Sequence, residues 1–264
     1  MTQLKNYQKQ FFNFYMEYKY LLDLCKKKNI EFYYFEKVNS TMDVSKKLFF
    51  ENKSTLLICS AQQTSGRGRL GNKWISNKGN IFFSLRFVPK VDLKKFYQIG
   101  ILSCISIKKT LKKFGISNVS IKWPNDIIVE NMKIGGVLTE TFFKNNYNYC
   151  TVGIGINFIN SPTIKKYSTT YIKKYNSSIN FEIFLTFLIK MIINSYNKWN
   201  DSKYNNLIDE YKKSLIFFGK EVIINNNNNL IKGILIDVTK DGYLVLNSNN
   251  KKRIIQSGFI EFKL

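Results

Sequence analysis

Residues 66–74, Gly-Arg-Gly-Arg-Leu-Gly-Asn-Lys-Trp, constrain the fold more than any other stretch of the sequence. The three glycines of this segment allow positive φ and let the backbone approach a ligand closely. Arg67 and Arg69 are two residues apart, so in an extended chain their side chains point the same way. Two guanidiniums on one side of a loop form a clamp for a carboxylate or a phosphate, and Trp74 offers a flat face to a ring. The sequence therefore predicts an anion-binding loop here.

The surroundings of this loop exclude the common nucleotide-binding loops. Its glycines match G-x-G-x-x-G, but a dinucleotide-binding fold requires a helix directly after them. Residues 72–79 instead contain Ser-Asn and end at a glycine before a strand-like run. A protein-kinase glycine loop does lie between strands, yet the other kinase signatures and the Walker A sequence are absent from the chain. The loop is therefore expected to join two strands of a different fold.

The charge of the chain leaves two interpretations open. Its 264 residues include 41 Lys and Arg against 18 Asp and Glu, a formal charge of +23. Such a charge is typical of proteins that bind nucleic acid. The lysines are nevertheless spread along the chain, and Asn, Ile, Tyr and Phe are abundant with them, which favours a compositional bias. A basic nucleic-acid-binding protein is kept as an alternative function.

The sequence contains no histidine, which excludes Ser-His-Asp and Cys-His catalysis, histidine metal sites and H-E-x-x-H chemistry. An enzyme of this composition must work through Arg, Lys, carboxylates and positioning.

The four cysteines stand alone without C-x-x-C, so neither a zinc site nor a redox pair is indicated, and we expect a cytoplasmic protein. The first nine residues lack the apolar region of a signal peptide. The apolar run 179–199 is interrupted by Glu182 and Lys190, which favours a packed helix over a membrane span.

Hydrophobic periodicity and turn residues predict an α+β chain with two parts. Strands are expected at 32–38, 55–61, 81–87, 119–122, 127–130, 133–141 and 149–159, and helices at 4–28, 41–51, 92–114, 180–199 and 203–214. Asn39-Ser40-Thr41 is expected to supply the N-cap of the second of these helices, and Asp43 in its first turn favours the helix dipole. From residue 219 onward, short strands separated by turns predict a small β module of the SH3 kind. We therefore expect a main domain over 1–216, with a helical lead at 1–30, and a β domain over 217–264.

A second informative region covers residues 119–141. Two strands meet at Trp-Pro-Asn-Asp, a turn fixed by proline, and a further turn leads into Lys-Ile-Gly-Gly-Val-Leu. This meander places Lys122, Asp126 and Lys133 near strand ends. Gly135 and Gly136 within a strand indicate close approach by a ligand or by another backbone. Each motif taken alone also has a purely structural explanation, such as a packed turn or a solvated lysine.

The order and spacing of these motifs together resemble the biotin–protein ligases. The residues that carry the resemblance are Ser40-Thr41-Met42, Gln63, the glycine loop 66–74, Lys122-Trp123-Pro124-Asn125-Asp126, Lys133 to Leu138, and Gly153-x-Gly155-x-Asn157. The resemblance runs from about residue 32 to the C-terminus. It implies a mixed, largely antiparallel sheet with helices, similar to class II synthetases and to biotin–lipoate ligase catalytic domains, followed by an SH3-like β-barrel.

Three features depart from the pattern of the family. Met42 stands where a polar residue is common, and Asn72 stands where arginine is common. Regulatory members of the family carry an N-terminal DNA-binding domain, whereas this sequence has a short helical lead, so we expect a monofunctional ligase that binds neither DNA nor membrane. The sequence leaves a monomer and a homodimer equally open.

The resemblance implies an ATP-dependent ligase. ATP and biotin are the substrates, with Mg²⁺ on the triphosphate rather than in a protein-held metal site. Biotin is activated as biotinyl-5′-AMP and then transferred to a lysine of a biotin carboxyl carrier protein, such as that of acetyl-CoA carboxylase. A lipoate or octanoate ligase is the alternative among enzymes, and a binding module without turnover is a further one.

The resemblance also implies the roles of the site residues. The predicted catalytic residues are Arg67, Asp126 and Lys133. The predicted biotin-binding residues are Ser40, Thr41, Met42, Gln63, Arg67, Gly68, Arg69, Lys133, Gly135 and Gly136. The predicted ATP- and adenylate-binding residues are Arg67, Arg69, Trp74, Lys122, Asn125, Lys133 and Asn157.

Overall fold

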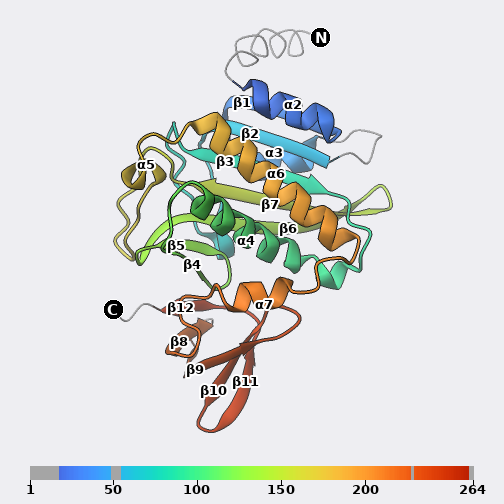
Figure 1. Cartoon of the computed structure of the whole chain (residues 1–264). Coiled ribbons are helices and arrows are strands. Elements are labelled where there is room, and N and C mark those ends of the chain that lie inside the picture. The colour runs from blue at the N-terminus through green and yellow to red at the C-terminus, as the bar shows by residue number, and fades with distance from the viewer. Residues whose placement is uncertain (1–17, 49–54, 227–228, 262–264) are drawn as a thin grey trace.

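A seven-stranded mixed sheet forms the centre of the protein (Figure 1). The computed structural model describes residues 18–48, 55–226 and 229–261. The sheet has the order β1-β2-β3-β7-β6-β5-β4, in which β1 and β2 are parallel and all other neighbours are antiparallel. The strands are β1 (Ile30–Val38), β2 (Thr55–Gln63), β3 (Ile81–Phe87), β4 (Val119–Lys122), β5 (Asp126–Val129), β6 (Met132–Lys144) and β7 (Tyr147–Ile156). The predicted mixed, largely antiparallel α+β fold is confirmed.

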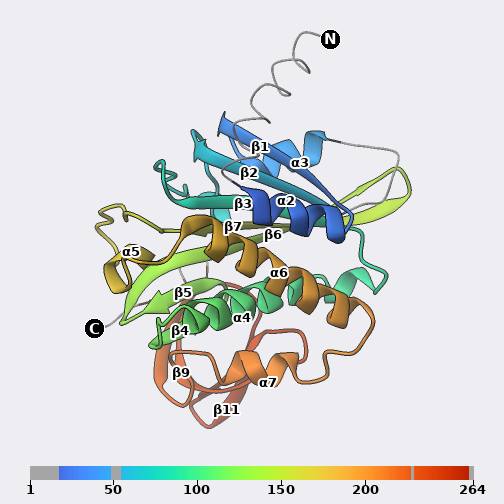
Figure 2. The ribbon, with the colours of Figure 1, turned by 45° about the horizontal axis from the view of Figure 1, so that its top comes forward.

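Three helices cover one face of this sheet, α2 (Lys19–Lys27), α4 (Tyr97–Lys113) and α6 (Phe181–Asn200) (Figures 1 and 2). Large apolar side chains of the strands point toward them; Phe87, for example, stacks on Tyr196 of α6 with ring centroids 3.9 Å apart. Asn180 caps α6 by accepting a hydrogen bond from the Ile183 N–H. Burial of these rings and aliphatic chains supplies the main stabilising term of the fold.

The opposite face of the sheet carries small and polar residues instead. Thr151, Gly153 and Gly155 alternate along β7 with the buried residues of the helix-covered face. The short helix α3 (Thr41–Lys47) packs here, where Ser45 Oγ lies 2.9 Å from Thr151 Oγ1. The missing side chains leave room above the sheet, and this room becomes the candidate site.

The C-terminal module is a five-stranded antiparallel sheet of order β11-β10-β9-β8-β12, which confirms the predicted small β domain. Its strands are β8 (Glu221–Asn226), β9 (Asn229–Val238), β10 (Leu244–Ser248), β11 (Lys251–Ile255) and β12 (Phe259–Glu261). It follows α5 (Ile172–Tyr175), α6 and α7 (Leu207–Lys212) in the chain. Trp123 Nε1 donates to Gly242 O at 3.0 Å, and residues of both parts share one buried core. The module is therefore fixed next to the end of the main sheet that bears β4 and β5 (Figure 1).

Several boundaries differ from the sequence-based expectations. Of the helix expected over 4–28, the described part is α2, and residues 4–17 lie outside the described residues. The helix after Ser40 ends at Lys47 with Leu48 extended, and α7 is shorter than the expected 203–214. Asp92 caps a 3₁₀ turn, Leu93–Lys95, instead of α4 itself.

The four cysteines are free and buried. Among the described residues, no helix is both long and apolar enough to cross a membrane.

Candidate active site

A cavity of about 630 Å³ lies over the small-residue face of the main sheet. Its walls come from the N-terminus of α3, the glycine loop 66–74, the β4–β5 turn, the segment 164–167 and strand β12. It is lined by Ser40, Thr41, Met42, Gln63, Arg67, Gly68, Arg69, Asn72, Lys73, Trp74, Lys122, Trp123, Pro124, Asn125, Asp126, Lys133, Gly136, Val137, Leu138, Gly153, Ile154, Gly155, Ile164, Lys166, Tyr167, Asn225, Phe259, Ile260 and Glu261. Side chains and backbone from segments far apart in the sequence thus meet around one space.

The structure brings most of the predicted site residues to this cavity, with two exceptions. Gly135 and Asn157 lie outside the lining, so the structure does not support their predicted ligand contacts. A Cβ at Gly135 would lie 2.9 Å from Gly155 O, so this glycine permits close packing of β6 on β7. Asn157 is 2% exposed, and its Nδ2 donates to Thr170 O at 3.0 Å. Asn157 therefore holds the chain that carries residues 164–167 and shapes the cavity from behind.

The glycine loop is folded back on itself. Gly68 N donates to Asn72 O at 2.7 Å, and Trp74 N donates to Gly66 O at 2.8 Å. The turn at Arg69–Gly71 needs positive φ at Leu70 (51°) and Gly71 (75°). Because of this turn the loop is not extended, and the prediction that the two arginines point the same way is wrong.

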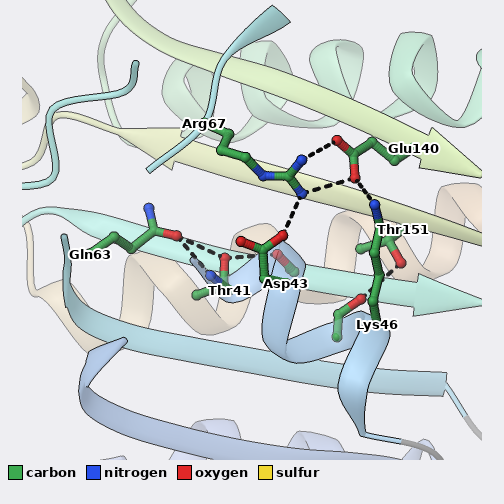
Figure 3. A network of polar contacts seen from close by, with 9 residues as sticks. Thr41, Asp43, Lys46, Gln63, Arg67, Glu140 and Thr151 are labelled. Carbon is green, nitrogen blue, oxygen red and sulfur yellow. Dashed lines mark hydrogen bonds and ion pairs between the residues drawn. The ribbon is translucent and has the colours of Figure 1, made fainter. Parts of the chain in front are cut away.

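Arg67 belongs to a network of four charged side chains, Asp43, Lys46, Arg67 and Glu140 (Figure 3). Its Nη1 and Nη2 donate to the two carboxylate oxygens of Glu140 at 2.8 and 3.0 Å, and Nη2 also lies 2.9 Å from Asp43 Oδ1. Lys46 Nζ lies 2.8 Å from Glu140 Oε2. Burial raises the pKa of the Glu140 carboxyl, but hydrogen bonds from Lys46 and Arg67 and the charges of both outweigh it and leave that pKa below its ordinary value.

Arg69 points to the C-terminal module. Its guanidinium carbon lies 5.6 Å from the centre of the Phe259 ring, and Nη1 lies 3.5 Å from Gly258 O. Burial lowers the pKa of Arg69, while the nearby Asp126 and Tyr211 raise it. Arg69 thus brings a partly desolvated cation to the cavity wall where the two parts of the protein meet.

Lys133 lies in the middle of the cavity wall, between two aromatic rings. Its Nζ is 2.7 Å from Asp126 Oδ1, 5.3 Å from the centre of the Trp74 ring and 5.2 Å from that of Tyr167. The Lys133 side chain is 15% exposed, so its charge is only weakly screened by water. Lys122, the cross-strand neighbour of Asp126, has its pKa lowered to about 8 by burial and by the charge of Lys133, against the opposing effect of Asp126.

Polar groups close the opposite end of the cavity. Gln63 Oε1 accepts hydrogen bonds from Thr41 N at 2.9 Å and from Thr41 Oγ1 at 3.2 Å, and Gln63 Nε2 donates to Ser76 Oγ at 3.0 Å. Ser40 makes no side-chain cap to α3, contrary to the expectation from the sequence. Its Oγ is buried and has no hydrogen-bond partner among the described residues. A buried hydroxyl without a partner on a cavity wall is suited to a polar ligand group.

Several lining residues were not found by sequence reasoning. Tyr167 and Lys166 come from a segment without a recognisable motif, and Phe259 reaches the site from the C-terminal module. Asp43 was assigned only to the helix dipole, and Glu140 was not singled out. No local signal in the sequence indicated these contacts, because each depends on how distant segments pack.

Comparisons with known proteins agree with this arrangement. The family model described as "Biotin/lipoate A/B protein ligase family" matches residues 34–157, and the "Biotin protein ligase C terminal domain" matches residues 217–263. The chain belongs to the biotin–protein ligase family. As a member of this family it is a ligase.

Curated relatives and solved structures extend the comparison. The chain is 24% identical over 237 residues to the bifunctional ligase/repressor BirA of Bacillus subtilis, covering 86% of this chain and 73% of that protein. It is 26% identical over 223 residues to biotin–protein ligase 2 of Arabidopsis thaliana, covering 79% and 67%. The biotin protein ligase from Aquifex aeolicus in complex with biotin and ATP has the same fold, with a TM-score of 0.75, 24% identity and coverage of 88% and 97%.

Proposed function

We propose that this ligase activates biotin with ATP and transfers the biotinyl group to one lysine of a biotin carboxyl carrier protein, such as that of acetyl-CoA carboxylase. The observation that carries the proposal is the cavity itself: Lys133, Lys122 and Arg69 line it together with an indole and a partnerless buried hydroxyl. Cations suit the phosphates and the carboxylate, the indole suits adenine, and the polar end suits the ureido ring of biotin. The bound ligands of the Aquifex aeolicus structure, biotin and ATP, agree with this choice of substrates.

The first step requires no protein nucleophile. The biotin carboxylate attacks the α-phosphorus of ATP, the bond from the α-phosphorus to the bridging oxygen breaks, and pyrophosphate leaves with biotinyl-5′-AMP as the product. Catalysis then consists of positioning and of charge neutralisation, which explains how a chain without histidine performs it. We place Lys133 where the carboxylate and the α-phosphate meet, and Arg69 and Lys122 beside the phosphates.

Magnesium enters this scheme as part of the substrate. The described residues contain no group of three or more His, Cys, Asp or Glu side chains that could hold a metal ion. Mg²⁺ usually binds through substrate phosphates and keeps several waters, and it would supply charge neutralisation for the leaving pyrophosphate. The protein residues here supply the remaining positive charge.

In the second step the acceptor amine attacks the acyl carbon of biotinyl-5′-AMP and AMP leaves. A lysine amine has a reference pKa of about 10.4 and must lose a proton before it attacks. Asp126 lies on the cavity wall with its Oδ1 bound to Lys133 at 2.7 Å. We propose that Asp126 orients the incoming amine or accepts its proton, while its charge holds Lys133 in place.

Biotin-dependent exchange of pyrophosphate into ATP tests the proposal. Exchange is expected with biotin and not with lipoate or octanoate. A lipoate or octanoate ligase is the second candidate, since the matched family model covers lipoate ligases as well, and the reverse pattern of exchange would support it. Tight and steeply salt-dependent binding of DNA or RNA without any exchange would support the nucleic-acid alternative instead. A monomer or homodimer and a cytoplasmic location stay predictions.

A further inference from the structure

The Arg67 network joins three elements that carry different walls of the cavity (Figure 3). Asp43 and Lys46 lie on α3, whose first turn brings Thr41 to the polar end of the cavity. Arg67 belongs to the glycine loop, and Glu140 belongs to β6. Glu140 is the one member that binds both cations of the network, at 2.8 Å to Lys46 Nζ and 2.8 Å to Arg67 Nη1. The position of this carboxylate therefore sets how the loop and α3 meet.

An anchor at Arg67 restrains the whole loop, because the loop is already bonded to itself. The hydrogen bond from Trp74 N to Gly66 O and a β-bridge between Arg67 and Lys73 close it into a small hairpin. Trp74, the last residue of this hairpin, packs on β7, where a Cβ at Gly155 would lie 2.5 Å from the indole. Displacement of Arg67 would consequently displace Trp74 and the ring face that it presents to the cavity.

The guanidinium of Arg67 has no pair of donors left for a ligand. Both terminal nitrogens bind carboxylates within the network. The Nε–H is buried and has no hydrogen-bond partner among the described residues. A two-pronged contact from Arg67 to a substrate carboxylate would thus require the pair with Glu140 or the pair with Asp43 to break. Arg69 and Lys133 have no comparable bidentate carboxylate partner in the described structure.

We propose that Glu140 is a positioning residue: it holds Arg67, and through it the glycine loop, over the cavity before substrate arrives. Arg67 then acts as the anchor of the loop, and the substrate anions are bound by Arg69 and Lys133. A loop that is ordered in advance lowers the entropic cost of binding, so this role should appear in substrate affinity more than in the chemical step. The identity of the substrate rests on the proposed function, whereas the anchoring role does not.

The variant Glu140→Gln keeps the shape of the side chain and removes its charge. We expect tryptic cleavage within residues 66–74 of the ligand-free protein to become about tenfold faster, as expected when a charge-assisted bidentate pair is lost. The KM for biotin in the pyrophosphate exchange should rise by about the same factor, while kcat changes less than about twofold. Glu36→Gln is the matched control: it removes an exposed pair, Glu36 with Lys78 at 3.6 Å, and should change neither quantity.

The competing role for Arg67 predicts the opposite sign. If Arg67 binds the substrate and Glu140 only neutralises it, Glu140→Gln frees the guanidinium and lowers the KM for biotin. That result, or loop cleavage at the wild-type rate, would overturn the proposal. Arg67→Lys keeps the charge without the fork; it should reproduce the effect of Glu140→Gln, and the double variant should be no worse than either single one. Full additivity of the two changes would also contradict the proposal.

Two arrangements keep the test decisive. If Glu140→Gln does not fold, Glu140→Asp and Arg67→Lys carry the same comparison, with faster loop cleavage expected for both and wild-type cleavage refuting the role. The cleavage assay needs no substrate. A wild-type protein without biotin-dependent exchange would therefore refute the proposed function, while cleavage of the variants would still decide the role of Glu140.

Discussion

Alanine at Gly155 would place a methyl carbon 2.5 Å from two atoms of the Trp74 indole, closer than real Cβ contacts come. The indole is rigid, so the whole ring, and the loop that carries it, must move away from β7. Overpacking of this kind costs about 1–3 kcal/mol, which corresponds to a roughly five- to 150-fold change in an equilibrium constant. If Trp74 holds the adenine end of the site, Gly155→Ala should raise the KM for ATP by a factor in this range and leave the KM for biotin much less affected.

Gly153, two residues earlier on the same face of β7, provides the matched variant. Alanine there would meet Sδ of Met42 at 2.7 Å and its Cγ at 2.9 Å, at the predicted biotin end of the cavity. Met42 is flexible and can adjust, so Gly153→Ala should have the smaller effect and should act on the KM for biotin. Both KM values are measured by pyrophosphate exchange with one substrate saturating. Equal changes of the two KM values in both variants would refute the assignment of the two ends.

Three further changes test other parts of the account. The affinity for ATP should fall as pH rises through about 8, because Lys122 is a cation below its pKa and neutral above it. Lys122→Arg should flatten a titration of the dissociation constant for ATP from pH 6.5 to 9.5, and an unchanged profile would remove Lys122 from phosphate binding. Asp126→Asn should slow transfer of biotin from preformed adenylate to the carrier domain, as followed by rapid quench, and wild-type transfer would contradict the role of Asp126. Trp123→Phe leaves Gly242 O without its donor and should lower the free energy of unfolding by about 1–3 kcal/mol in a urea titration. An unchanged free energy would contradict a stabilising role for this hydrogen bond.

The sequence was sufficient to locate the strands because strand patterns are local. The strand Ile81–Phe87 has the bounds expected for it, just after the glycine that ends residues 72–79, and the Trp-Pro turn lies between β4 and β5. Gly135 and Gly136 were expected to permit close approach by a ligand or by another backbone. In the structure a Cβ at Gly135 would lie 2.9 Å from Gly155 O, so another backbone comes close there. Gly153 and Gly155 make room for Met42 and for the indole of Trp74, side chains that only tertiary packing brings to them.

Side-chain pairs between distant segments were beyond sequence reasoning. Arg67 and Glu140 are 73 residues apart, and Arg69 and Gly258 are 189 apart, and no periodicity connects positions at such separations. The same limit explains Ser40, which has the chemistry of an N-cap but a buried hydroxyl on the cavity wall. Capping preference is a local tendency, and the fold of α3 against the sheet decided otherwise. The charged pairs that organise the loop were therefore found only from the structure.

The central claim, biotin activation followed by transfer, is tested most directly by mass spectrometry of one incubation. The protein is mixed with ATP, Mg²⁺, equal amounts of biotin and lipoate, and a biotin carrier domain, and a parallel sample omits the carrier. The account predicts that biotinyl-5′-AMP accumulates without the carrier and that one lysine of the carrier gains a biotinyl group when it is present. Lipoyl adenylate in place of biotinyl adenylate, or the absence of any acyl adenylate, would contradict it.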